Sequence, residues 1–357
     1  MKTSHIPIGS MVGILGGGQL GQMLALAAYR LGYRVKVLAE TPDEPATFVT
    51  NNCTIGSFTD PETLHKFSSS VDLGIIEFEN IPISAVAELT KNMPIYPGVK
   101  ALHVAQNRIR EKSHIASLGI KVTPFREVTC MDTLRDSARS MGYPVVLKTA
   151  ELGYDGKGQY LIRDQSCLEK IIPELRKDCV YIVEKFLDIC KEISIIVAMS
   201  SDSSYEFFPI AQNKHSGGVL SQSLVPAEIS DHVSDEIKAI ALSIASSLDM
   251  VGILAVEFFV TNSGELLVNE IAPRPHNSGH WSMDACNVSQ FEQLIRAACG
   301  LPLREVKLLS PCTMHNIFSN NEISHDVYLD PSTSISIYGK SPRPGRKMGH
   351  ITTLLSK

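Results

Sequence analysis

Excess positive charge is absent from this sequence, in which 33 lysines and arginines face 38 aspartates and glutamates for a formal net charge of −5. Such a chain has no basic field for the phosphates of a polymer, so we expect no nucleic-acid partner. The sequence also has no run of roughly 18 apolar residues that could span a membrane. Its opening, MKTSHIPIGS, lacks the charged and then apolar pattern of a signal peptide. We therefore expect a cytoplasmic protein that contacts no membrane and whose partners are small molecules.

Cysteines in metal-ligand spacing are absent as well. The eight cysteines are scattered along the chain, with no C-x-x-C pair and no Cys/His cluster. We expect reduced, packed thiols rather than disulfides or a zinc site. The chain does have size and apolar content, with 357 residues of which 44% are hydrophobic, and this is enough for roughly two or three domains with full cores.

The order of apolar runs and helical patterns divides the chain into three parts. Residues 11–100 alternate short strands with helices, which predicts an α/β unit with a doubly wound parallel sheet. Pro94 and Pro97 end this unit, and a helical stretch begins at residue 101. From residue 144 onward, strands joined by tight turns predict an α+β region with largely antiparallel pairing. We predict three domains, residues 1–100, 101–301 and 302–357, of which the last is small and rich in strands.

The first of two glycine-rich segments follows the first predicted strand, where Gly16, Gly18 and Gly21 have G-x-G-x-x-G spacing. Backbone amides at a helix N-terminus can receive a phosphate, and Glu40 would then be the ribose ligand of a dinucleotide site. A tight strand-to-helix turn without a ligand explains the same glycines equally well. The motif alone leaves both interpretations open.

The second glycine-rich segment is GYDGKGQ, residues 153–159. It is no Walker loop, because no Ser or Thr follows Lys157 and a strand comes next. A flexible hairpin with one lysine and one aspartate fits a lid that covers a polyphosphate and brings a base to the reaction. The alternative is a solvated hairpin tip. Lys148, an ammonium in an apolar strand that needs an anionic partner, argues for the lid.

A predicted hairpin carries the strongest local argument for a metal. If Ser263 and Gly264 form its two-residue turn, Glu257 and Glu270 face each other on one side of the strand pair. Like charges there are destabilising, so a cation should lie between them, and paired carboxylates are how Mg²⁺ is usually held beside a nucleotide. Asn269 offers another oxygen. An exposed pair on a wet face is the alternative, which the apolar character of both segments disfavours.

Cationic side chains follow in the turn IAPRPHNSGHW, which contains Arg274, His276 and His280. Cations just beyond a metal site fit a transferred phosphoryl group or an anionic substrate. Either histidine could equally be a structural hydrogen-bonding residue.

Two further segments fit parts of a ribonucleotide. VEKFL, residues 183–187, offers backbone groups and apolar side chains for adenine, with Glu184 or Glu192 for ribose hydroxyls. The loop PRPGRK holds Arg343, Arg346 and Lys347 and suits a phosphate monoester, although a solvated tail is the alternative; its prolines and glycine favour a rigid turn.

Seven motifs, taken in order, closely resemble those of the 5-(carboxyamino)imidazole ribonucleotide synthases, ATP-grasp enzymes of purine biosynthesis. They are GILGGGQLGQML, EFENIP, GYDGKGQ, VEKF, EFFV, NEIAPRPHNSGHW and RPGRKMGH. The likeness runs from about Val12 to His350, so residues 1–10 precede it, and NEIAPRPHNSGHW and GYDGKGQ are its most specific parts. It implies a pre-ATP-grasp domain, an ATP-grasp domain with a lid subdomain at about 120–187, and a small C-terminal domain.

The resemblance also implies the reaction and the partners. The family converts 5-aminoimidazole ribonucleotide, ATP and bicarbonate into the carboxyamino product, ADP and phosphate. ATP and Mg²⁺ are the implied cofactors, with Mn²⁺ as a substitute. A homodimer is implied too, as is transfer of the product to a carboxyaminoimidazole ribonucleotide mutase.

The site residues that the resemblance implies fall into three sets. The nucleotide set is Arg108, Lys148, Gly153, Tyr154, Asp155, Gly156, Lys157, Gly158, Gln159, Glu184, Lys185, Phe186, Leu187, Glu192, His215, Asn269 and Glu270. The metal ligands are Glu257 and Glu270, and the substrate contacts are Gln19, Leu20, Glu79, Tyr154, Arg274, His276, Arg343, Arg346 and Lys347. Leu152 stands where the family commonly has a second glycine, which affects the flexibility of the lid rather than its chemistry.

The expected mechanism starts with attack of bicarbonate on the γ-phosphorus, with Lys148 and Arg274 offsetting the developing charge. The amine of the ribonucleotide then attacks carboxyphosphate, or carbon dioxide released from it, with Asp155 as the base. The rival functions are a formate-dependent glycinamide ribonucleotide transformylase, a biotin carboxylase, a nicotinamide dehydrogenase and a non-catalytic nucleotide sensor. The glutamate pair disfavours the dehydrogenase, and the complete set of lysine, base and metal ligands disfavours the sensor.

Overall fold

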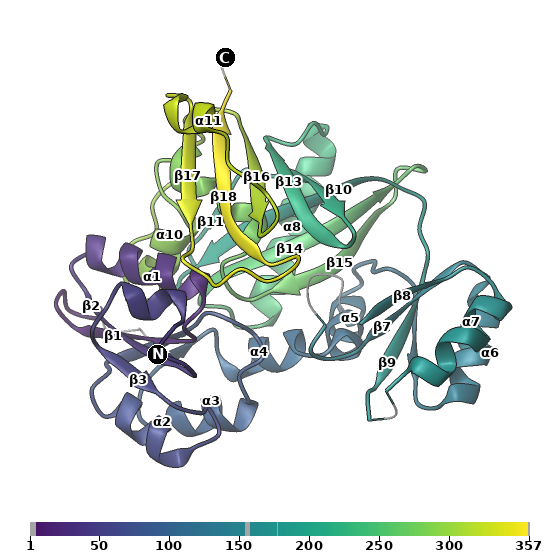
Figure 1. The fold of residues 1–357 in the computed structure, drawn as a ribbon, viewed down its shortest axis with the longest axis horizontal. Coiled ribbons are helices and arrows are strands. Elements are labelled where there is room, and N and C mark those ends of the chain that lie inside the picture. The colour runs from purple at the N-terminus through teal and green to yellow at the C-terminus, as the bar shows by residue number, and fades with distance from the viewer. Residues whose placement is uncertain (1–4, 154–157, 177, 356–357) are drawn as a thin grey trace.

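The computed structural model describes residues 5–153, 158–176 and 178–355, and three sheets organise them (Figure 1). The N-terminal sheet has the strand order β3-β2-β1-β4-β5 with every neighbouring pair parallel, as the sequence predicts. Its inner strands β1 and β4 are almost entirely buried on both faces, which explains their continuous apolar runs. The elements are β1 (Met11–Leu15), α1 (Gln19–Arg30), β2 (Arg34–Ala39), β3 (Cys53–Ile55), α2 (Pro61–Ser68), β4 (Leu73–Ile76), α3 (Ile83–Leu89) and β5 (Ile95–Tyr96).

Two helices follow where the sequence predicts one helical stretch. Helix α4 (Val99–Ala105) ends before Asn107, whose side chain accepts hydrogen bonds from the N–H groups of Ile109 and Arg110 and so begins α5 (Arg108–Ser117). An asparagine in this role satisfies amides that have no partner within the helix. The new start places Arg108 at the first turn of α5.

The lid sheet is a separate antiparallel sheet with the order β6-β9-β7-β8. It lies at the end of the molecule away from the N-terminal sheet, with its two helices on the outer side (Figure 1). Its elements are β6 (Phe125–Val128), α6 (Met131–Met141), β7 (Val145–Thr149), β8 (Gln159–Ile162), α7 (Gln165–Ile171) and β9 (Tyr181–Lys185).

The central sheet has nine strands in the order β15-β14-β10-β12-β13-β16-β18-β17, with β11 pairing to β10. The C-terminal strands do not form a sheet of their own, because β16 pairs with β13 and extends the same sheet. The elements are β10 (Ile189–Met199), β11 (Tyr205–Phe207), β12 (Ala211–Ser216), β13 (Val219–Val225), α8 (Asp231–Ser247), β14 (Gly252–Thr261), β15 (Leu266–Ala272), α9 (Ser282–Ala285), α10 (Gln290–Ala298), β16 (Cys312–Phe318), α11 (His325–Leu329), β17 (Thr333–Ile337) and β18 (Lys347–Leu354).

One hydrophobic cluster joins the N-terminal sheet to the central sheet. It contains residues of β1 and α1 together with Trp281 and residues of α10. Helices α1 and α10 pack against each other, and Trp281 is only 1% exposed. A shared core of this kind fixes the two sheets relative to each other. Within the described residues, no helix is long and apolar enough to cross a bilayer.

A buried histidine pair connects the C-terminal strands to this core. His350 on β18 is fully buried, its Nδ1 lies 2.8 Å from the Tyr338 hydroxyl oxygen, and its ring centroid is 5.1 Å from that of His280. Burial lowers the pKa of His350 to about 4. The folded protein therefore keeps this imidazole neutral.

We predict an acid-sensitive stability that depends on His350. The unfolded chain binds the imidazole proton near pH 6.5, so stability is complete above about pH 6.5 and decreases as the pH falls toward 4, by roughly 3 kcal/mol for this group. Urea unfolding at about pH 7.5 and about pH 5 measures the difference. His350→Gln should reduce that difference, whereas the exposed His232→Gln should keep it; an unchanged difference in His350→Gln would refute the assignment.

Candidate active site

A cavity of about 360 Å³ is lined by residues from or beside all three sheets. Most of the predicted site residues line it, namely Glu79, Arg108, Lys148, Gly153, Gln159, Glu184, Lys185, Phe186, Leu187, Glu192, His215, Glu257, Asn269, Glu270, Arg274 and His276. The predicted residues that do not line it are Gln19, Leu20, Gly158, Arg343, Arg346 and Lys347. Tyr154, Asp155, Gly156 and Lys157 lie outside the described residues.

A buried carboxylate between two lysines forms the lid side of the cavity. Lys148 Nζ on β7 lies 2.7 Å from Glu184 Oε2 on β9, which confirms that this strand lysine has an anionic partner. Lys112 Nζ on α5 lies 3.3 Å from Glu184 Oε1. Burial opposes ionisation of Glu184, but the two ammonium groups outweigh it and lower the pKa to about 2. Glu184 therefore fixes the place of Lys148.

The hairpin of β14 and β15 pairs Glu257 with Glu270, as predicted, but not through the predicted two-residue turn. Thr261 N–H bonds to the Glu265 carbonyl, so the loop has three residues, Asn262–Gly264, with φ +81° at the glycine. A three-residue loop alone would set Glu257 opposite Asn269. A β-bulge between Glu257 and Phe258 leaves Asn269 without a partner in β14 and restores the glutamate pair.

The two paired carboxylates have different electrostatic surroundings. Burial also opposes ionisation of Glu270, but Arg108, whose Nη1 lies 2.8 Å from Glu270 Oε2, outweighs this effect and lowers the pKa of Glu270. Burial and the neighbouring Glu270 raise the pKa of Glu257. One member of the pair is thus neutralised by an arginine, while the other needs a further cation or a proton.

The donor atoms at this pair fit a hard divalent cation. Ligand atoms of Glu257, Glu270 and His276 all lie within 4.8 Å of one another. Asn269 Oδ1 is buried and has no hydrogen-bond partner among the described residues. Carboxylate and amide oxygens of this kind are the ligands that Mg²⁺ prefers, so the residues present fit the metal.

An arginine beyond β15 binds the N-terminal unit to the cavity wall. Arg274 forms a two-point ion pair with Glu79, with Nη2 2.8 Å from Oε1 and with Nε bound to Oε2. Burial raises the pKa of Glu79, and Arg274 more than offsets this effect, so the carboxyl stays ionised. The motif EFENIP therefore contacts NEIAPRPHNSGHW directly, across the joint between two sheets.

The structure separates the three predicted site histidines. His280 is 1% exposed, its Nδ1 accepts a hydrogen bond from Gln290 Nε2 at 3.0 Å and its ring packs on Phe291, so its structural interpretation is the right one. His276 lines the cavity, where burial and Arg274 lower its pKa to about 3. His215 Nδ1 lies 2.5 Å from Glu192 Oε2; burial lowers its pKa, but the bond to Glu192 outweighs that effect and raises it.

Two amides of the first glycine motif are already bound by a carboxylate, which disfavours a dinucleotide there. Glu77, at the end of β4, accepts hydrogen bonds from Gly18 N–H at 2.9 Å and from Gly21 N–H at 3.1 Å. Its carboxylate therefore occupies the helix N-terminus at which a pyrophosphate would bind. Gln19 and Leu20 begin α1 beside it, with Leu20 7% exposed.

Sequence reasoning missed Glu77, Glu111 and Lys112. Glu111 is 3% exposed, and burial and Glu270 raise its pKa to about 8. Lys112 is fully buried, and its Nζ donates to the carbonyl of the bulged Asn269 at 2.8 Å. Lys112 therefore connects Glu184 on the lid side to the glutamate hairpin.

A sequence signal for α5 was available. Arg108, Glu111 and Lys112 have i, i+3 and i+4 spacing, which puts three charges on one helix face. Such a face is normally solvated, and only its partners on β15 and β9 make it part of the site.

Of the three predicted C-terminal basic residues, two lie in a loop and the third begins a strand. Arg346 Nη1 donates to the Ser341 carbonyl at 2.9 Å within the loop that also holds Arg343. Lys347 begins β18, and its positive charge acts on Glu257 and His276 in the cavity. The loop therefore approaches the cavity from the C-terminal strands.

Three family models together match most of the chain. They are an ATP-grasp domain over residues 113–291, a ribonucleotide synthetase preATP-grasp domain over 10–106 and a phosphoribosylaminoimidazole carboxylase C-terminal domain over 312–357. The N5-carboxyaminoimidazole ribonucleotide synthase of Bacillus subtilis is 40% identical over 355 residues, which cover 99% of this chain and 93% of the relative. That of Brucella melitensis is 39% identical, with 99% and 98% covered.

Solved structures agree with these relatives. The N5-carboxyaminoimidazole synthetase of Staphylococcus aureus, complexed with ADP, has a TM-score of 0.95 at 35% identity and covers 100% of this chain and 96% of its own. The synthase of Aspergillus clavatus in complex with ADP and 5-aminoimidazole ribonucleotide has a TM-score of 0.89 at 27% identity, with 97% and 94% covered.

We predict that Lys112→Met destabilises the protein by about 3–5 kcal/mol, because it leaves a buried carboxylate without one of its counter-charges. Urea unfolding of the two chains measures the loss. Lys121→Met is the matched control. It removes an exposed lysine whose Nζ lies 2.7 Å from Glu265 of the β14–β15 hairpin, and it should change stability little. Equal effects of the two substitutions would show that burial of the Lys112 pair is not what matters.

Proposed function

This chain belongs to the N5-carboxyaminoimidazole ribonucleotide synthase family, and from that premise we propose that it carboxylates 5-aminoimidazole ribonucleotide with bicarbonate while ATP is split to ADP and phosphate. It is an ATP-dependent carbon–nitrogen ligase of purine biosynthesis with an ATP-grasp fold. The cavity where the three sheets meet carries the proposal for this chain. It brings paired carboxylates, partly buried lysine and arginine side chains and the Glu79–Arg274 contact into one space.

We place ATP between the lid sheet and the central sheet. The end of β9 offers backbone groups of Lys185, Phe186 and Leu187 to adenine, and Phe186 is 46% exposed. Glu192 lies on β10, the next strand along the chain, where it pairs with His215, and its carboxylate suits ribose hydroxyls. Because Glu184 is engaged by two lysines, its main contribution is to hold Lys148 toward the phosphates, as Glu270 holds Arg108.

The metal site of the proposal is the pair Glu257 and Glu270, with Asn269 Oδ1 as a further oxygen. Mg²⁺ bound there, or Mn²⁺ in its place, would offset the charge of the β- and γ-phosphates. Gly153 and Gln159, which line the cavity, and Gly158 flank the segment 154–157, and the whole loop would cover the phosphates as a lid.

The chemistry needs two bond exchanges. A bicarbonate oxygen bonds to the γ-phosphorus as the bond to the bridging oxygen of ADP breaks, and Lys148 and Arg274 offset the charge that develops. The exocyclic amine of the ribonucleotide then bonds to the carbon of carboxyphosphate, or of carbon dioxide released from it, and phosphate leaves. The amine proton passes to a base, for which we propose Asp155.

The ribonucleotide lies on the N-terminal side of the cavity in this proposal. Gln19, Leu20, Glu79 and Tyr154 would contact its ring and sugar, with Arg274 and His276 at the reacting end. Arg343, Arg346 and Lys347 would bind its phosphate, since a cationic loop of this kind recognises a phosphate monoester.

The remaining expectations come from family membership. We propose the domain boundaries 1–100, 101–301 and 302–357 with a lid at about 120–187, a homodimer, and a cytoplasmic location. A carbamate product is acid-labile, so transfer to a carboxyaminoimidazole ribonucleotide mutase is the expected next step.

We predict that ADP formation from ATP, Mg²⁺ and bicarbonate rises sharply when 5-aminoimidazole ribonucleotide is added, with one acid-labile carboxyamino product per ADP. A coupled ADP assay with product analysis by mass spectrometry measures both. Formate with glycinamide ribonucleotide, and biotin, serve as alternative substrates. Turnover with either of them, or ADP binding without any turnover, would refute the proposed reaction.

A further inference from the structure

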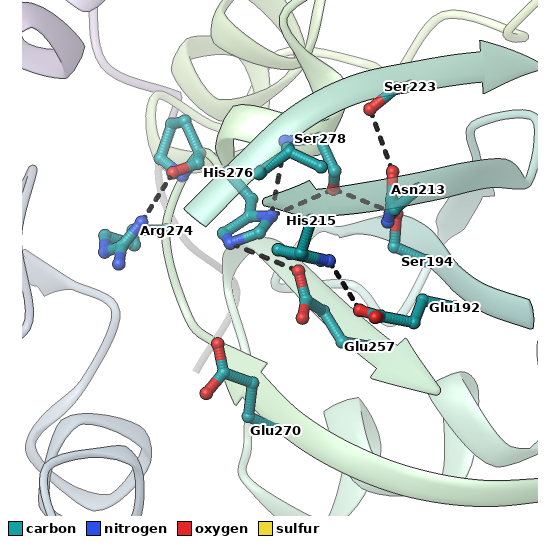
Figure 2. A network of polar contacts seen from close by, with 12 residues as sticks. Glu192, Ser194, Asn213, His215, Ser223, Glu257, Glu270, Arg274, His276 and Ser278 are labelled. Carbon is teal, nitrogen blue, oxygen red and sulfur yellow. Dashed lines mark hydrogen bonds and ion pairs between the residues drawn. The ribbon is translucent and has the colours of Figure 1, made fainter. Parts of the chain in front are cut away.

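Four buried polar side chains lead from the middle of the central sheet to His276 (Figure 2). Ser223 Oγ donates to Asn213 Oδ1 at 2.8 Å, and Asn213 Nδ2 donates to Ser194 Oγ at 2.9 Å. Ser194 Oγ donates to Ser278 Oγ at 2.9 Å, and Ser278 Oγ lies 2.9 Å from His276 Nδ1. None of the first four side chains is more than 4% exposed, so solvent does not compete for these bonds.

A backbone group shows the direction of the last bond. The N–H of Ser278 also points at His276 Nδ1, at 3.4 Å. A backbone N–H can only donate, so Nδ1 holds a lone pair and the single ring proton is on Nε2. Ser278 Oγ then donates to the same nitrogen, and its own lone pair accepts from Ser194. The donor-to-acceptor order deduced from the Ser278 backbone amide therefore agrees with the order deduced from the Asn213 side chain.

We propose that Ser278, Ser194 and Asn213 are positioning residues that hold His276 as a hydrogen-bond donor through Nε2. His276 lines the cavity, and its Nε2 lies 3.7 Å from Glu257 Oε1 (Figure 2). The ring therefore offers the cavity one N–H and no lone pair. His276 is therefore neither a metal ligand nor the base of the reaction. Its distance from Glu257 and Glu270 alone would have allowed it to be a third metal ligand.

The identity of the acceptor rests on the proposed function. Within that reaction, the Nε2–H would bind an oxygen of bicarbonate or of carboxyphosphate, next to the metal ligands. A donor in a fixed tautomer needs no reorganisation when the negative charge on that oxygen changes. The polar chain thus contributes to turnover without touching the substrate.

The tautomer can be measured without any substitution in the chain of bonds. Two-bond ¹H–¹⁵N spectra of the full chain labelled at histidine show which nitrogen of each of the 11 histidines carries the proton, and His276→Gln identifies the signal. The expected spectrum has a protonated Nε2 and an unprotonated Nδ1 between about pH 6 and pH 8. A protonated Nδ1, or averaged signals from two tautomers, would overturn the proposal.

Ser278→Ala tests the polar chain itself. It leaves only the long backbone contact to Nδ1, so the single-tautomer spectrum should be lost and kcat should fall by about 10-fold to 100-fold, with the Kd for ADP unchanged. Ser282→Ala is the control, because it also deletes a buried hydroxyl in this segment, one that donates to the Gly279 carbonyl at 2.6 Å, and it should preserve both the spectrum and kcat.

The two proposals fail separately. A Ser278→Ala chain that keeps one tautomer and normal turnover would reject the role of the polar chain. If that variant does not fold, the spectrum of the unmodified chain still decides where the ring proton is. A chain with the expected tautomer that makes no carboxylated product would refute the proposed function and leave the tautomer assignment in place.

Discussion

Two carboxylates face each other across β14 and β15 at the wall of the cavity, and their mutual repulsion is the constraint that the surrounding charges resolve. Arg108 neutralises Glu270, and Glu257 is left with a raised pKa. Lys112 binds the carbonyl of the bulged residue between the strands and also reaches the lid-side Glu184. The same few charges therefore connect the hairpin to the lid lysine and leave Glu257 in need of a further cation or a proton.

Much of the framework could be predicted from the sequence, because its signals are local. Continuous apolar runs separated by helical patterns predict the parallel N-terminal sheet, and the structure confirms it. Lys148 in an apolar strand predicts an anionic partner, which is Glu184. The glutamate pair was also predicted, although through a two-residue turn. The loop has three residues, and the bulge at Asn269 shifts the register back by one residue. Glu257 and Glu270 are therefore still paired, and the alternation of apolar and polar residues does not reveal the change.

The parts that sequence reasoning missed depend on contacts between distant segments. Glu77 accepts the amides of the first glycine turn only because β4 lies beside β1 in the sheet. Lys112 and Glu111 become buried only when α5 packs against β15. The order of hydrogen bonds from Ser223 to His276 involves three strands and a turn. No single segment carries such information, so only the three-dimensional arrangement reveals it.

The proposed function requires Glu257 and Glu270 together to hold the divalent metal. A crystal of the chain grown with ADP and Mn²⁺, measured at the manganese absorption edge, tests it directly because the anomalous signal locates the metal independently of the rest of the map. We expect a peak within bonding distance of carboxylate oxygens of both glutamates, with His276 turned to donate rather than to ligate. A metal bound by the nucleotide phosphates and Glu192, with both glutamates unbound, would contradict the account.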